Sequence, residues 1–184
     1  MRKVFIFLAL LFAVSVKAEA RGCAYDVQFL NNAGPSLTAS ELAMDPARFD
    51  PVAAPPNGAF EARSVTGVMW LRITDMSGCD GAPWMAAKFP YLTDTQLYAF
   101  NTAPAGSPHR PPDVRSVSRL PFLYPAWPLA DAWDPSAETY LLRIAYPDKV
   151  ILPLHIDTPR AIAGEAAIFA FVNLALIILL AGQF

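Results

Sequence analysis

Short stretches in which hydrophobic and polar residues alternate run through the middle of the chain and predict β-strands. The clearest is Gly67–Thr74, where a period of two separates two faces. One face holds Met69, Leu71 and Ile73, and the other holds Val68, Trp70, Arg72 and Thr74. Further strands are expected at Trp84–Phe89, Thr95–Asn101, Val114–Tyr124, Glu138–Tyr146 and Lys149–Asp157. Short strands separated by turns rich in Gly, Pro and Asp indicate an all-β sandwich.

The last two of these strands are expected to form a hairpin-like pair around Pro147-Asp148. Alternation puts Arg143 on the face opposite the apolar run of its strand, and His155 on the face opposite the apolar run of the next. The stretch Pro125–Pro135 is broken by prolines and predicts a loop that carries Trp127 and Trp133.

One short helix is predicted near the start of the domain. Thr38 stands three residues before Glu41, which is the spacing of a capping box. Asp45-Pro46 and Asp50-Pro51 end this helix soon afterwards, because the residue before a proline disfavours the helical conformation.

Two apolar segments bound the domain. Arg2-Lys3 followed by Val4–Val16 has the pattern of a secretory signal peptide, so residues 1–20 are expected to be cleaved off after Ala18 or Ala20. Ala166–Gly182 carries no charge, and its length lies at the lower end of the roughly 17–25 residues that cross a bilayer. We therefore expect a transmembrane helix in residues 163–184, with a buried core helix as the alternative, and one sandwich domain in residues 21–162.

Composition excludes several classes of protein. All 18 prolines lie in residues 21–162, which excludes a bundle of long helices, because each proline blocks a helix interior. The net charge of −2 argues against a nucleic-acid partner, which would favour a basic face. We find none of the HExxH, CxxC or GxSxG patterns and predict no enzyme, no cofactor and no metal, with Asp75 and Asp80 in a solvated turn rather than a calcium site.

Two cysteines, Cys23 and Cys79, remain after removal of the signal peptide. In an exported chain an even pair permits one disulfide, and two unpaired thiols are the alternative.

Several short motifs, in order, resemble a bacterial extracellular domain. They are Leu30-Asn31-Asn32, Pro35-Ser36-Leu37-Thr38, Phe49-Asp50-Pro51, Trp70-Leu71-Arg72, the run Phe89–Tyr98, Leu120-Pro121-Phe122, Tyr140-Leu141-Leu142-Arg143 and Leu152–Ile156. Their order and spacing are similar to those of the type 2 extracellular sensor domain of seven-transmembrane receptors with diverse intracellular signalling modules (7TMR-DISM). The similarity covers about residues 27–182, including the apolar segment that follows the last strand.

This resemblance implies a jelly-roll-like sandwich similar to carbohydrate-binding modules, with a sensory role outside the cytoplasm. In that family further membrane helices and a cytoplasmic output module follow. The sequence here carries one membrane helix, so we expect a fragment or a truncated relative, with the helix in the inner membrane and the sandwich in the periplasm or outside the cell.

Four residues are candidates for ligand binding: Trp70, Arg72, Arg143 and His155. If their strands lie together, these side chains share one outer sheet surface, where an indole stacks on a sugar ring and guanidinium groups bind hydroxyls or carboxylates. The alternative is that Trp70 packs beneath a loop and each arginine pairs with a nearby aspartate.

The sequence therefore favours a membrane-tethered domain that senses a carbohydrate or another small molecule, either singly or as a homodimer. The alternative is a structural or adhesive sandwich that binds a protein partner.

Overall fold

The computed structural model describes residues 23–52, 59–62, 67–79, 81–89, 92, 94–100, 113–122, 124–129, 139–145 and 150–181. The expected signal peptide, residues 1–20, lies outside this range, as do Asp80, the Pro147-Asp148 turn and Trp133.

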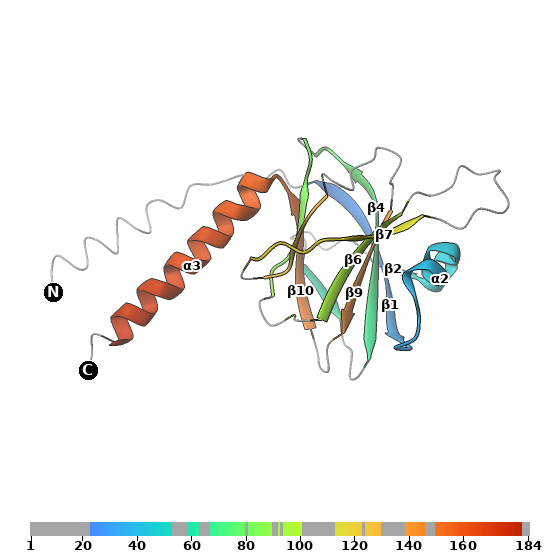
Figure 1. The fold of residues 1–184 in the computed structure, drawn as a ribbon, viewed down its shortest axis with the longest axis horizontal. Helices are drawn as coiled ribbons and strands as arrows, with labels where there is room; N and C mark the ends of the chain where they lie inside the picture. Colours follow the sequence, from blue (N-terminus) through green and yellow to red (C-terminus); the bar gives the residue numbers. More distant parts are fainter. Residues whose placement is uncertain are drawn as a thin grey trace.

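In the part of the chain that the structure describes, ten strands form two antiparallel sheets that face each other (Figure 1). The larger sheet has the order β2-β1-β4-β9-β6-β7. Its strands are β1 (Ala24–Ala33), β2 (Asp50–Pro51), β4 (Val68–Ser77), β6 (Asp94–Phe100), β7 (Val114–Val117) and β9 (Thr139–Ala145). The smaller sheet has the order β3-β10-β5-β8, with β3 (Ala59–Ala62), β5 (Trp84–Ala87), β8 (Ala126–Pro128) and β10 (Val150–Asp157). The predicted all-β domain is thus confirmed, while the jelly-roll topology stays a prediction.

The hydrophobic core lies between the two sheets and uses the predicted inner faces. From the larger sheet it takes Met69, Leu71, Ile73, Tyr140, Leu142 and Ile144. From β10 it takes Leu152, Leu154 and Ile156. All nine side chains are at most 2% exposed, so the period-two pattern identified the buried face of each strand correctly.

The pairing of the last two strands differs from the expectation. β9 lies between β4 and β6 in the larger sheet, whereas β10 lies between β3 and β5 in the smaller one, so the predicted hairpin is wrong. The chain crosses from one sheet to the other between these strands, and their apolar faces meet across the core instead of side by side.

The sequence also missed strands β1, β2, β3 and β8. The pairing of β1 with β4 runs from Ala24↔Ser77 to Ala33↔Val68 and is interrupted by two register shifts. Trp127 lies on β8 and is 1% exposed in the core, so its predicted place in an open loop is wrong.

Helix α2 (Ala39–Met44) covers part of the outer face of the larger sheet. The predicted capping box is confirmed, since Thr38 and Glu41 exchange hydrogen bonds between side chain and backbone at both positions. Asp45 ends the helix, and the short 3-10 helix η1 (Pro46–Arg48) follows. Leu42 is fully buried against the sheet, which fixes α2 over this face.

Helix α3 (Pro159–Ala181) follows β10 with only Thr158 between them, and it projects away from the side of the sandwich opposite α2 (Figure 1). Its segment Pro159–Ile178 is long enough and apolar enough to cross a membrane, and 11% of that segment is buried. A buried core helix, the alternative drawn from the sequence, is therefore wrong.

The first turns of α3 pack on the outer face of the smaller sheet. Ile162 and Ala166 are buried in a cluster with Ala86, Tyr124 and Ala126. The hydroxyl of Tyr124 donates a hydrogen bond to the carbonyl of Ile162 at 3.2 Å. An ion pair between Lys88, directly after β5, and Glu165 of α3 adds to this contact between helix and sheet. The helix therefore begins as part of the domain and not after a linker.

Cys23 and Cys79 form a disulfide, with their Cα atoms 4.7 Å apart. The expected bridge is confirmed, and the alternative of two free thiols is wrong. Closing a loop of 56 residues stabilises the fold by about 4 kcal/mol in the chain-entropy account. The disulfide joins the start of β1 to the end of β4. The N–H of Cys23 also donates a hydrogen bond to the carbonyl of Ile156, which holds this junction next to the last residues of β10.

Candidate functional site

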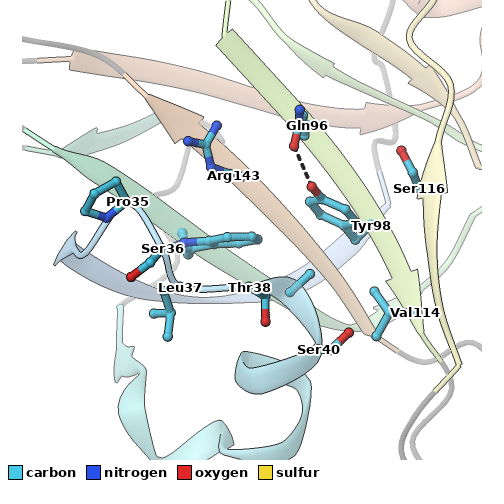
Figure 2. A pocket seen from close by; sticks show the side chains of 12 residues that line it. Pro35, Ser36, Leu37, Thr38, Ser40, Gln96, Tyr98, Val114, Ser116 and Arg143 are labelled. Atoms are coloured by element: carbon cyan, nitrogen blue, oxygen red, sulfur yellow. Dashed lines mark hydrogen bonds between the residues drawn. The ribbon is translucent and has the colours of Figure 1, made fainter.

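A groove of about 400 Å3 opens on the outer face of the larger sheet, beside the segment that leads into α2 (Figure 2). That volume lies within the roughly 300–1,000 Å3 range of small-molecule sites. The described residues that line it are Pro35, Ser36, Leu37, Thr38, Ala39, Ser40, Trp70, Gln96, Tyr98, Val114, Ser116 and Arg143. Two of the four predicted ligand residues, Trp70 and Arg143, are therefore part of one concave surface.

Trp70 forms the floor beneath this groove. Its side chain is 1% exposed and belongs to a buried cluster that includes Leu42 of α2, Leu141 and Phe49. The ring of Tyr98 lies against it, with 5.8 Å between ring centroids and a tilt of 32°. The open stacking surface expected from the sequence is therefore wrong, because α2 and the segment before it cover the indole.

The indole N–H of Trp70 is buried, and none of the residues that the structure describes accepts a hydrogen bond from it. Such a group loses its bonds to water on folding and gains nothing in return, which costs about 1–3 kcal/mol. This donor is buried beneath the groove, so an acceptor atom of a ligand would be stabilised there only after the covering residues move.

Arg143 stands directly opposite Trp70 across the β4–β9 pair, with Gln96 opposite it on the other side. Its Nη1 donates to Oδ1 of Asp94 at 2.9 Å. The side chain of Arg143 is 18% exposed and that of Asp94 is 53% exposed. The arginine is thus partly withdrawn from water, while its counter-ion lies at the rim.

Sequence reasoning missed Gln96, Tyr98 and Ser116. The hydroxyl of Tyr98 donates to Oε1 of Gln96, and both side chains stand on the groove side of β6 (Figure 2). The alternation of β6, which buries Thr95, Leu97 and Ala99, could have identified the outer positions of Gln96 and Tyr98. Nothing in the sequence indicated that α2 would lie beside them.

Arg72 shares the sheet face with Trp70 but does not line the groove. Its Nη1 donates to Oε1 of Gln28 on β1 at 2.8 Å. Desolvation lowers the pKa of Arg72, and the nearby charge of Asp75 opposes part of that effect. Arg72 thus bonds across the β1–β4 pair, away from the candidate site.

His155 lies on the other sheet, so its predicted place beside the other three residues is wrong. It pairs with Ala86 on the outer face of the smaller sheet, where α3 begins. The whole core separates it from the groove. Burial, followed by the charge of Lys88, lowers the pKa of His155, while Glu165 and Asp157 act in the opposite direction.

No model of a protein family, no curated protein and no solved structure matches this chain. The similarity to the 7TMR-DISM sensor domain consequently stays a prediction from the sequence.

Chemically, the groove offers hydrogen-bond donors beside aromatic and apolar surface, which is an arrangement that binds small molecules. Among the described residues, no group of three or more His, Cys, Asp or Glu side chains could hold a metal ion.

Replacing Trp70 tests its place under the groove. We expect Trp70→Ala to lower the free energy of unfolding by roughly 3–5 kcal/mol, because it removes a large buried side chain. Trp70→Phe should cost clearly less, since it keeps a ring against Tyr98 and removes the unpaired N–H. Urea unfolding of the full chain in detergent measures the free energy of unfolding of both variants.

Arg48→Ala is the control. It removes an exposed ion pair with Asp45 and should change stability by about 0–1 kcal/mol. Equal losses for Trp70→Ala and Arg48→Ala would contradict the placement.

The depressed pKa of His155 predicts how stability depends on pH. The folded protein favours neutral His155, whereas the unfolded chain binds the proton near the ordinary pKa of 6.5. Stability from this group is therefore present above about pH 6.5 and is lost as the pH falls below it. Urea unfolding from about pH 7.5 to about pH 5 should show a steeper loss for the wild type than for His155→Gln. Parallel curves would refute the assignment.

Proposed function

We propose that this protein is the extracytoplasmic ligand-sensing domain of a membrane signalling receptor, and that it binds a carbohydrate or another small molecule. The observation that carries the proposal is the groove, where a partly desolvated arginine lies opposite a buried indole whose N–H has no partner among the described residues. A purely structural sandwich has no need of an unsatisfied buried donor there.

The way in which α3 is attached supports a sensing role. The helix continues from β10, and its first turns are packed on the smaller sheet through Ile162, Ala166 and Tyr124. A helix fixed in this way follows any movement of the sheet that carries it. In this proposal the sandwich detects the ligand and α3 passes the change to the rest of a receptor.

The disulfide and α3 together support the proposed location. Disulfides persist in oxidising compartments, which favours a sandwich in the periplasm or outside the cell. Along α3, large apolar side chains such as Ile168, Phe171 and Ile177 are more than half exposed, and a bilayer would cover them. We place α3 in the inner membrane.

Reporter fusions test this orientation. A reporter that is active only outside the cytoplasm should be active when fused after Asp157, at the end of β10, because the sandwich is exported. The same reporter fused after Phe184 should be inactive, because α3 has crossed the membrane by then. Activity at both positions would mean that α3 does not span the bilayer in this orientation.

Filling the groove tests the ligand-sensing function. The full chain in detergent should bind at least one member of a panel of neutral and acidic oligosaccharides, with a Kd of roughly micromolar to millimolar. Ser116→Trp should weaken that binding at least tenfold, because the new ring enters the groove from an exposed position on β7. Calorimetry on both proteins gives the two values.

Ser118→Trp is the matched control, because Ser118 is exposed, lies two residues further along the chain and does not line the groove. It should bind like the wild type. Equal losses in both variants, or no binding by any member of the panel, would contradict the proposal.

A further inference from the structure

The hydrogen-bonding groups of the groove are mostly donors. Within the part of the chain that the structure describes, the buried N–H of Trp70 has no hydrogen-bond partner, and Arg143 lines the same groove as Trp70. The carbonyl oxygen of the Gln96 side chain already accepts the hydroxyl proton of Tyr98. The described lining includes hydroxyl groups from Ser36, Thr38, Ser40 and Ser116 but no carboxylate. Such a surface is complementary to a ligand that brings acceptor atoms.

Two carboxylates bond to lining residues from outside the groove, and both are exposed. Asp94 pairs with Arg143, and Glu41 accepts the N–H and the hydroxyl of Thr38. Because the side chain of Asp94 is 53% exposed, it is solvated by water when it is released, which lowers the cost of replacing it on Arg143 with a competing anion. Arg143 itself is only 18% exposed, so an anion that reaches it is weakly screened by water.

The two principal donors are carried by residues that lie directly opposite each other in the sheet. Trp70 and Arg143 are direct partners in the β4–β9 pairing and point to the same face. Side chains at such positions start roughly 4.5–5.5 Å apart, within reach of the two oxygens of a single carboxylate. One oxygen would accept from the indole N–H and the other from the guanidinium.

We propose that the groove binds a small organic molecule through a carboxylate group that bridges the indole N–H of Trp70 and the guanidinium of Arg143, displacing Asp94. This inference rests on the proposed function and adds the chemical class of the ligand.

Access to the indole requires a shift of the covering segment. Trp70 is 1% exposed beneath the turn Gly34–Leu37, which is closed by a hydrogen bond from the N–H of Leu37 to the carbonyl of Gly34. Gly34, Pro35 and Ser36 are all exposed, and open space surrounds Gly34. The proposal requires that outward movement of this turn uncover the N–H for an acceptor.

Three carboxylates of increasing size and their neutral counterparts test the proposal on the full chain in detergent. The pairs are acetate and acetamide, lactate and lactamide, and glucuronate and glucose. Calorimetry should show that at least one carboxylate binds at least tenfold more tightly than its counterpart. In a nitrogen–proton spectrum the same ligand should shift one indole N–H signal, which Trp70→Phe removes.

The variants are predicted to change affinity in opposite directions. Arg143→Gln should weaken carboxylate binding at least tenfold, and Arg143→Lys should weaken it less because the charge remains. Asp94→Asn should strengthen binding, because it removes the competing carboxylate. Arg48→Gln, on η1, should leave the affinity unchanged. Thermal melts verify that each variant is folded, and Arg143→Lys replaces Arg143→Gln if the latter is not.

Preference for the neutral partner in every pair, no binding of any carboxylate, or weaker binding in Asp94→Asn would each overturn the proposal. If an oligosaccharide still binds in the Ser116-dependent manner described above, the ligand-sensing function stands and only the carboxylate class is wrong. If neither set of compounds binds, both proposals fail.

Discussion

The central strands β4 and β9 are buried on both faces, and most features of this protein follow from the need to cover them. Their inner faces meet the smaller sheet across the core, through residues such as Leu71 and Leu142. Their outer faces carry Trp70 and Leu141, which require a second cover. Helix α2 provides it, and because α2 has only six residues the cover is incomplete. The groove lies where that cover ends.

The local features of the fold could be predicted from the sequence. The period of two in β4 identified its core face, and the spacing of Thr38 and Glu41 identified the start of α2. Both depend on neighbours within a few residues. The strand β8 was not predicted because prolines lie in and around it. The strand β1 was not predicted because its register shifts interrupt the alternation of inner and outer residues.

The arrangement of strands between the two sheets could not be predicted in the same way. β9 and β10 follow each other closely, and a hairpin is the simplest connection for such a pair. Their true partners are β4, β6, β3 and β5, which the chain supplies from distant positions. The candidate site includes features that follow from local sequence and features that depend on long-range packing. The sequence left open whether the strands of Trp70 and Arg143 are neighbours, and in the structure they are. His155 was assigned to the wrong sheet, and the burial of Trp70 depended on where α2 packs.

The groove and the start of α3 lie on opposite outer faces of the sandwich, with two sheets and a close-packed core between them. Protein interiors of this density are nearly incompressible, so a local disturbance on one face is not absorbed by the side chains in between. It has to be taken up by sliding or tilting one whole sheet against the other. Because Thr158 is the only residue between β10 and α3, and the helix is also tied to the sheet at Ile162, such a tilt would turn the helix axis by a similar angle. In the proposed receptor, the sandwich would thus be a rigid connection between the groove and the membrane helix.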